Sequence, residues 1–379
     1  MDLYKSKWPI YSDDMINDVS NILKSGKVNQ WTGQKVFEFE KKCSEYFGVK
    51  HSIAVFNGTV ALELCLKVLN IKQGDEVIVT SRSFIASSSC INILGATPIF
   101  VDVDENSQNI NLQNIVKVKT DNTKAVILVH LAGWPCDVEE ICKWCKENNI
   151  YVIEDCAQAH GAKYNGKYVG TFGDINAWSF CQDKIISTGG EGGMVTTNNT
   201  ELFIKAWEYK DHGKNYHKMK EKGEPGFFRW VHDSIGTNYR MTEIQATIGI
   251  HSLENLNSWI IMRRQNADTF NEIFSNNSCI RLTIPEQKYY HSYYKYYCFI
   301  IPEKCSKTRD TIIREINEQN IPCFQGTCGE IYKEKAYDLN LDLPVTKKLF
   351  DTSITLLLDP SYDNNTIKQI AHKINNIIF

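Results

Sequence analysis

Residues 51–70, HSIAVFNGTVALELCLKVLN, indicate the fold class of this chain. The run over residues 51–57 is typical of a buried strand, and residues 58–70 continue with leucine and valine at helical spacing. The same alternation of a short apolar run with a helical stretch extends to about residue 200. Nearly continuous apolar strands separated by helices predict a mostly parallel sheet with helices on both faces. We therefore predict an α/β fold.

Beyond residue 200 the pattern changes to mainly helical segments. The longest predicted helix lies near residues 242–274, with a strand near 293–302 and a terminal helix near 365–379. The first 45 residues are expected to form two amphipathic helices. The sequence therefore predicts two domains, namely a large α/β domain over residues 1–250, which includes the N-terminal helices, and a smaller C-terminal α+β domain over residues 251–379.

Composition excludes several classes of partner. The formal net charge of −3 gives no field that would attract nucleic acid or an anionic membrane. No apolar run reaches the roughly 20 residues that a membrane span needs, and the N-terminal residues lack the apolar region of a secretory signal. The 13 cysteines are odd in number and irregularly spaced, and Cys65, Cys90 and Cys298 lie in apolar patterns. We expect reduced thiols, a cytoplasmic location, and neither nucleic acid nor membrane as a partner.

A metal site is not expected. The one C-x-x-C pair, Cys142 and Cys145, lies in a predicted helix. A zinc site would need a second pair of ligands, and none has a suitable spacing.

Polar residues follow two predicted strands, at the edge where parallel sheets bind ligands. Asn57, Gly58 and Thr59 stand between a strand and a helix, so the backbone N–H groups and the Thr59 hydroxyl could bind an anion. The alternative is a plain helix N-cap by Asn57 or Thr59. Glu154 and Asp155 end another strand, where they could cap a helix, or Asp155 could be a buried carboxylate that needs a cationic or hydrogen-bonding partner.

Residues 184–193, KIISTGGEGG, place a lysine before a glycine-rich turn. A P-loop has its glycines before the lysine, and a dinucleotide-binding turn follows the first strand and opens a helix, so neither pattern is present. A surface lysine beside a turn is the plain alternative. Pyridoxal phosphate, however, needs a lysine that bonds to its aldehyde, an acid that holds its pyridine nitrogen and a cradle for its phosphate. Lys184, Asp155 and the helix start together match these needs.

Several ordered segments carry a family resemblance. They are residues 25–62, 74–104, 154–180 (beginning EDCAQAHG), 184–195 and 236–249 (beginning GTNYRM). In these segments the chain resembles the DegT/DnrJ/EryC1/StrS family of pyridoxal phosphate-dependent nucleotide-sugar aminotransferases, which have fold type I, the aspartate aminotransferase-like fold. The resemblance covers most of the chain and is weaker in the last 100 residues.

The resemblance implies roles for individual residues. Lys184 would bond to the cofactor and move a proton between the substrate carbon and the cofactor, and Asp155 would pair with the pyridine nitrogen. The protein would be a homodimer with shared active sites. The other implied cofactor contacts are Phe84 and Gln158 on the two sides of the ring, and Gly58, Thr59, Ser179 and a neighbouring subunit's Asn238 at the phosphate.

The implied reaction converts a nucleotide-linked 4-keto-6-deoxy sugar to the 4-amino sugar in bacterial surface-glycan biosynthesis, such as that of O-antigen and lipopolysaccharide. L-glutamate would give the nitrogen and leave as 2-oxoglutarate, with the cofactor in its pyridoxamine phosphate form during turnover. The alternatives are a 3-aminotransferase, a sugar 3-dehydratase and a non-catalytic binding or regulatory protein of the same fold. The dehydratases of the family carry histidine at the lysine position, so Lys184 argues against that activity.

Two stretches depart from the family pattern. Cys181, Gln182 and Asp183 precede Lys184, where many relatives carry asparagine directly before the lysine. Lys210 and Asp211 stand where an arginine is often found, so the resemblance does not extend to a contact of that arginine with a donor carboxylate or a nucleotide phosphate. The sequence assigns no role to these residues.

Overall fold

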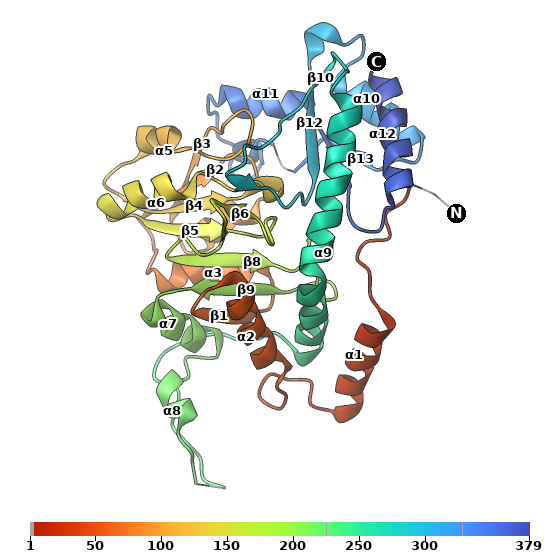
Figure 1. Ribbon diagram of the computed structural model, residues 1–379. Coiled ribbons are helices and arrows are strands. Elements are labelled where there is room, and N and C mark those ends of the chain that lie inside the picture. The colour runs from red at the N-terminus through yellow and green to blue at the C-terminus, as the bar shows by residue number, and fades with distance from the viewer. Residues whose placement is uncertain (1–3, 225, 328) are drawn as a thin grey trace.

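The computed structural model describes residues 4–224, 226–327 and 329–379. Its central sheet has seven strands in the order β1-β9-β8-β5-β4-β2-β3 (Figure 1). β9 pairs antiparallel with both β8 and β1, and the other neighbours are parallel, which confirms the predicted α/β fold with a mostly parallel sheet. The strands are β1 His51–Val55, β2 Glu76–Thr80, β3 Thr97–Val101, β4 Thr123–Val129, β5 Tyr151–Asp155, β8 Ile175–Ser179 and β9 Gly193–Thr197.

Helices cover both faces of this sheet because its strands are apolar on both sides. In β2, Val77 and Val79 belong to one apolar cluster and Ile78 to another, as alternation along a strand requires. The first cluster includes residues of α3 Gly58–Val68, α4 Ala86–Ile93 and α7 Thr200–Lys210. The opposite face is covered by α2 Lys35–Phe47, α5 Leu112–Val118, α6 Val138–Glu147 and α9 Glu243–Phe274.

The long helix α9 links the two parts of the molecule (Figure 1). It has 32 residues, so it is about 48 Å long. A capping box between Thr242 and Gln245 fixes its start. It packs against α2 and also against the C-terminal helix α12, Asn364–Ile378. The predicted boundary between residues 250 and 251 falls inside this helix, and the division into two domains stays a prediction.

A second, antiparallel sheet has the order β10-β12-β14-β13. Its core contains Phe270, Cys298, Ile354 and Ile374, all fully buried. Its strands are β10 Ile280–Arg281, β12 Tyr296–Ile300, β13 Cys323–Phe324 and β14 Ser353–Leu356, with helices α10 Arg309–Glu318 and α11 Pro344–Thr352. A three-stranded sheet joins β11 Tyr289–Tyr290, β6 Lys163–Tyr164 and β7 Lys167–Tyr168. Single-turn helices lie at η1 Leu131–Gly133, η2 Pro302–Lys304 and η3 Ile331–Lys333.

The N-terminal segment lies against the C-terminal part of the chain. The Ser6 hydroxyl donates to Asp359 at 2.7 Å, and the Tyr362 hydroxyl donates to the carbonyl of Tyr4 at 2.9 Å. The two predicted N-terminal helices are present as α1, Asp13–Ser25, and α2, and α1 packs against α9.

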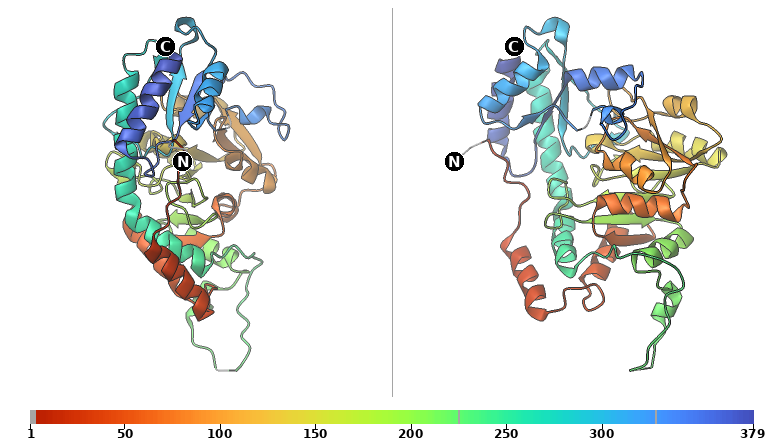
Figure 2. Two further views of the ribbon diagram at one scale, coloured as in Figure 1. Left: turned by 90° about the vertical axis from the view of Figure 1, so that its right-hand side faces the viewer. Right: turned by 180° about the vertical axis from the view of Figure 1, so that it is seen from behind.

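An arm that begins with α8, Tyr216–Lys220, projects away from the body of the molecule (Figure 2). Along it Phe227, Phe228 and Trp230 are exposed. Within the described ranges no helix combines the length and apolar character that crossing a bilayer requires. The twelve cysteines of those ranges are free thiols, and Cys65 and Cys90 are buried as predicted.

Candidate active site

A cavity of about 610 Å³ opens at the carboxyl ends of β5 and β8, beside the start of α3. This is the edge at which parallel sheets bind ligands. The predicted residues that line it are Gly58, Thr59, Phe84, Asp155, Gln158, Ser179 and Lys184. Of the residues that the structure describes, Asn238 is not in the lining; it forms a bridge with Asp211.

The start of α3 forms a polar cradle in the cavity wall. Asn57 is the N-cap, and its side-chain oxygen accepts a hydrogen bond from the Val60 N–H at 3.0 Å. Gly58 and Thr59 lie in the first turn, where a helix carries N–H groups without intrahelical partners and a partial positive charge. A methyl group at Gly58 would lie 2.5 Å from Cβ of Ser179, so only glycine lets the helix approach β8 this closely. This cradle fits a phosphate.

Asp155 closes the inner end of the cavity, and its side chain fits a protonated ring nitrogen. The residue is only 4% exposed. One carboxylate oxygen accepts from the Ser87 hydroxyl at 2.8 Å, and the other accepts from the Ala157 N–H at 3.1 Å. Burial raises the pKa of Asp155, against the opposing effects of the Ser87 hydrogen bond and the Lys184 charge. A cationic N–H from a bound pyridine ring would favour the ionised carboxylate.

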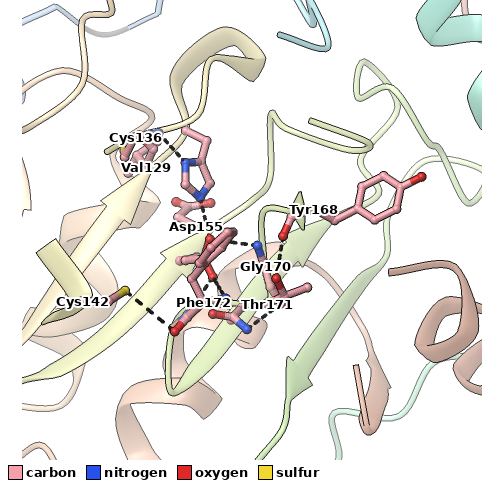
Figure 3. A network of polar contacts seen from close by, with 12 residues as sticks. Val129, Cys136, Cys142, Asp155, Tyr168, Gly170, Thr171 and Phe172 are labelled. Atoms are coloured by element: carbon pink, nitrogen blue, oxygen red, sulfur yellow. Dashed lines mark hydrogen bonds and ion pairs between the residues drawn. The ribbon is translucent and has the colours of Figure 1, made fainter. Parts of the chain in front are cut away.

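Glu154, the preceding residue, has a different environment from Asp155. Figure 3 labels Asp155 together with Gly170 and Phe172, two of the residues whose backbone N–H groups bind Glu154. Its carboxylate is fully buried and accepts from the His130 ring at 3.0 Å and from three backbone N–H groups, those of Gly170, Phe172 and Gly173, at 2.8 Å each. Although burial opposes ionisation, these bonds and the neighbouring ring hold the pKa of Glu154 below its usual value. Glu154 therefore anchors the end of β5 and does not line the cavity.

A group of possible metal ligands lies at the same place. Ligand atoms of His130, Glu154 and Cys156 lie within 4.8 Å of one another. The other ring nitrogen of His130 accepts from the Cys136 N–H at 3.0 Å, so the ring is already bonded on both sides. The hydrogen bonds account for this cluster without an ion. The pair Cys142 and Cys145 lies in α6, as predicted, and the absence of a metal site stays a prediction.

Lys184 reaches the cavity from the loop that follows β8. Its backbone carbonyl accepts from the Trp8 indole N–H at 3.0 Å, and its N–H donates to the Cys181 carbonyl at 3.0 Å. Its amine lies 3.5 Å from the Tyr294 hydroxyl and 3.8 Å from the Asp183 carboxylate. Two segments distant in sequence thus hold the lysine in place, which rules out a plain surface lysine.

Phe84, Gln158 and Ser179 complete the predicted set. Phe84 is 62% exposed although it lines the cavity, so it is not a core residue. The Gln158 side chain is fixed, because its oxygen accepts from the Ala132 N–H at 2.8 Å. The Ser179 hydroxyl accepts from the Cys181 N–H at 3.4 Å and faces the start of α3.

The outer wall of the cavity comes from the second sheet and the loops beside it, and sequence reasoning missed it. Its residues are Tyr294, Lys295, Tyr297, Phe324, Gly326, Thr327 and Thr355. They lie in the part of the chain where the family resemblance is weakest. Ser87 was also missed, because nothing in the sequence separates it from the two serines beside it.

The departures at Lys210 and Asp211 lie away from the cavity lining. Lys210 is fully buried and donates to the Gln30 side chain at 3.0 Å, and burial lowers the pKa of Lys210. Asp211 accepts from the Trp31 indole at 2.9 Å and from Arg240 at 2.8 Å. The side chains of Lys210 and Asp211 therefore form hydrogen bonds to other side chains of this chain.

Comparison with known sequences gives a match to the DegT/DnrJ/EryC1/StrS aminotransferase family over residues 9–375. The chain is 36% identical over 371 residues to GDP-perosamine synthase of Escherichia coli O157:H7, covering 97% of each chain. It is 33% identical over 369 residues to dTDP-3-amino-3,6-dideoxy-alpha-D-galactopyranose transaminase of Aneurinibacillus thermoaerophilus, covering 96% of this chain and 95% of that protein.

Solved structures give the same result. An aminotransferase from Psychrobacter cryohalolentis superposes with a TM-score of 0.96 at 45% identity, over 98% of each chain. A putative sugar aminotransferase from Streptococcus pneumoniae in its PMP form superposes with a TM-score of 0.87 at 26% identity, over 97% of each chain. PMP is pyridoxamine phosphate, the amino form of pyridoxal phosphate. The cradle at the start of α3, Asp155 and Lys184 of this chain fit that cofactor. The chain therefore belongs to the DegT/DnrJ/EryC1/StrS aminotransferase family, and it is a pyridoxal phosphate-dependent aminotransferase with the fold of that class.

Proposed function

We propose that this enzyme transfers the amino group of L-glutamate to C4 of a nucleotide-linked 4-keto-6-deoxy sugar in bacterial surface-glycan biosynthesis. The observation that carries the proposal is the meeting of Lys184, Asp155 and the start of α3 in one cavity. The sugar class is supported by the names of the relatives, which are enzymes of nucleotide-linked amino sugars. Position C4 is supported by the GDP-perosamine synthase, because perosamine is a 4-amino sugar.

The cavity residues have distinct tasks in this proposal. Gly58, Thr59 and Ser179 would hold the phosphate, while Phe84 and Gln158 would fix the plane of the ring. When bound, the cofactor accepts electrons from the substrate carbon and carries nitrogen between the two substrates.

Two residues would act on protons. Asp155, as a carboxylate, keeps the ring nitrogen protonated. The amine of Lys184 would hold the cofactor aldehyde and, once free of it, would move a proton between the reacting carbon of the bound substrate and the cofactor.

A homodimer with shared active sites is part of the proposal. Phe84 is largely exposed at the cavity, and Asn238 lies outside its lining, which is consistent with a second copy that brings its Asn238 to this site. Lys184→Ala and Asn238→Ala proteins should each be inactive or weak alone. Mixed and allowed to exchange subunits, they should regain activity, because one site of each mixed dimer has both native residues. A mixture that stays as inactive as its parts would contradict shared sites.

The direct test supplies L-glutamate and a panel of nucleotide-linked 4-keto and 3-keto sugars, with products resolved by mass spectrometry and NMR. We expect a 4-amino sugar and 2-oxoglutarate. Lys184→Ala should still bind the cofactor without a covalent bond but should form no product. A protein that acquires no visible absorbance band with pyridoxal phosphate would contradict catalysis and favour a binding or regulatory role.

Amination at C3 is the second candidate, because the relative from Aneurinibacillus thermoaerophilus is named for a 3-amino sugar. The same panel separates the two positions by NMR. A deoxygenated product in place of an amino sugar would instead identify a 3-dehydratase.

A further inference from the structure

Lys295 lies in the outer wall of the cavity, directly before β12. The N–H of the preceding residue, Tyr294, donates to the Ala132 carbonyl at 2.8 Å, and β12 pairs with β14 from Tyr296 onward. Side chains alternate along a strand, so Lys295 and Tyr297 line the cavity, while Tyr296 between them belongs to the core of the second sheet. The backbone therefore fixes the direction from which the Lys295 amine enters the cavity.

Lys295 supplies a positive charge to a cavity that is lined by several carboxylates. Of the described residues in the lining, Lys184 and Lys295 alone have a cationic side chain, whereas Asp155, Asp183 and Glu191 have carboxylates. Under the proposed function the cofactor occupies the Lys184 amine. Both proposed substrates are anions, because an amino-acid donor carries carboxylates and a nucleotide-linked sugar carries a diphosphate. Lys295 is then the cation of this lining that is left for a substrate.

The Lys295 amine has an incomplete set of partners. It lies 3.9 Å from a carboxylate oxygen of Asp183, too far for a hydrogen bond, and 4.8 Å from the centre of the Tyr294 ring. No residue that the structure describes accepts a hydrogen bond from this amine, although an ammonium group has several N–H donors. Burial lowers the pKa of Lys295, against the opposing effect of the Asp183 charge. A bound anion would offset this cost of burial and accept the free N–H groups.

The position of the amine favours an anion that is close to the reacting carbon. The Asp183 carboxylate is also 3.8 Å from the Lys184 amine, and that amine too is 4.8 Å from the centre of the Tyr294 ring. In an α-amino acid, the α-carboxylate is bonded to the carbon that gives up its proton. In a nucleotide-linked 4-keto sugar, the diphosphate is attached at C1, across the sugar ring from C4. A cation this near Lys184 therefore fits the α-carboxylate better than the diphosphate.

We propose that Lys295 is a substrate-binding residue that holds the α-carboxylate of the amino-acid donor. The distal carboxylate of L-glutamate and the diphosphate of the sugar are bound by other groups. This inference rests on the proposed function, because the donor is part of it, and it applies to whichever α-amino acid the enzyme uses.

The test measures donor binding without turnover. 2-Methyl-L-glutamate keeps the amine and both carboxylates of L-glutamate but has no α-proton, so an absorbance titration of enzyme loaded with pyridoxal phosphate gives its Kd. Lys295→Met keeps the length of the side chain and removes its charge, and we expect Kd to rise about 30-fold. Lys295→Arg keeps the charge and should stay within about fivefold of wild type. Lys295→Gln is a second uncharged variant, which replaces Lys295→Met if that protein does not fold.

Lys347→Met is the matched control. Lys347 pairs with Asp351 at 2.7 Å on the exposed face of α11 and is not in the cavity lining, so its loss should leave the Kd unchanged. An unchanged Kd in folded Lys295→Met and Lys295→Gln proteins would overturn the proposal. So would a Kd in Lys295→Arg that rises as far as in Lys295→Met, because the charge would then not be the cause.

Three further probes identify the group that Lys295 binds. 2-Methyl-L-glutamine has a neutral distal amide, and its Kd should rise in Lys295→Met by the same factor as that of 2-methyl-L-glutamate. 4-Aminobutyrate lacks the α-carboxylate and should bind equally to both proteins. Calorimetry should also give the same Kd for GDP in both. A loss of affinity that disappears with 2-methyl-L-glutamine would identify a site for the distal carboxylate, and a loss confined to GDP would identify a phosphate site; either result overturns the proposal.

The same measurements distinguish this inference from the proposed function, because none of them needs a keto sugar. If Kd rises as expected but no keto sugar is aminated, the inference stands and the proposed function fails. If a sugar is aminated but Kd does not change in Lys295→Met, the inference alone fails. A wild-type enzyme whose absorbance no α-amino acid changes would overturn both.

Discussion

The two faces of the sheet at the end of β5 present neighbouring carboxylates in contrasting surroundings. Glu154 on one face is enclosed by hydrogen-bond donors, three of them backbone N–H groups. Asp155 on the other face has two donors and borders the cavity. Side chains alternate between faces along a strand, so one residue step separates the two environments. A carboxylate with a full set of partners stabilises the strand end, and one with an incomplete set can bind a ligand.

The contrast predicts that stability and activity separate at these positions, and the largest effect should be on rate. Asp155→Asn should lower kcat by about 1,000-fold, because a neutral amide does not hold the ring nitrogen protonated. Its thermal unfolding midpoint should not fall, since the ionised carboxylate is costly to bury without a cation. Steady-state kinetics and calorimetry on the same preparation check this. A kcat within tenfold of wild type would contradict the role of Asp155 at the ring nitrogen.

Glu154→Gln tests the enclosed side. It leaves buried donors facing a neutral amide and should lower the free energy of unfolding by about 3 kcal/mol. The kcat per folded molecule should stay near wild type. Urea unfolding gives the stability, with Glu140→Gln on the exposed face of α6 as the control. A Glu154→Gln enzyme that keeps its free energy of unfolding but loses most of its kcat would contradict the assignment of Glu154 to stability.

A pair of glycines extends the comparison to the backbone. Gly170 has φ +79°, and a methyl group there would lie 2.2 Å from the Trp178 ring, so Gly170→Ala should destabilise the fold by about 2 kcal/mol. Gly58→Ala would press on Ser179 and should weaken cofactor binding about tenfold, equivalent to about 1.4 kcal/mol. Unfolding curves and cofactor titrations of both variants are the measurements. Equal effects of the two variants on cofactor binding would contradict the distinction.

The smallest expected effect is on the pH dependence of stability. The pKa of Glu154 is depressed in the folded state, so its stabilisation is present above its usual value of 4.5 and is lost as pH falls through the lower folded value. The pKa of Asp155 is raised, so its contribution has the opposite sign and is lost as pH rises from its usual 3.8 through the folded value.

In urea unfolding between about pH 3 and pH 6, stability should therefore depend less on pH in Glu154→Gln and more steeply in Asp155→Asn. If the free energy of unfolding changed with pH equally in the two variants, the environments of Glu154 and Asp155 would not differ as described.

The sequence predicted the fold well because its signals are local. The apolar run of β4 and the spacing of α9 identify these elements without knowledge of their neighbours. The strand-end positions of Gly58 and Asp155 likewise follow from local order. The family resemblance supplied Phe84, Gln158 and Ser179, which the residues alone would not have indicated.

The rest of the site depends on contacts between distant segments. Trp8 reaches the carbonyl of Lys184 across 176 positions, and Tyr294 reaches its amine across 110. The residue patterns around Trp8 and Tyr294 do not indicate that either residue contacts Lys184. The small sheet of β6, β7 and β11 was missed for the same reason, because its strands are two residues long and join distant parts of the chain.

The close approach of α3, β8 and β9 has a consequence for how the enzyme keeps its cofactor. A methyl group at Gly193 would lie 2.4 Å from the Asn57 carbonyl, so the cradle exists only when these three elements are packed together. The unfolded chain has no such cradle, and binding confined to the folded form adds to the free energy of unfolding, by about 2.7 kcal/mol at a ligand concentration 100 times Kd. Supply of pyridoxal phosphate should then govern how long the protein survives heat and proteolysis as well as how fast it works.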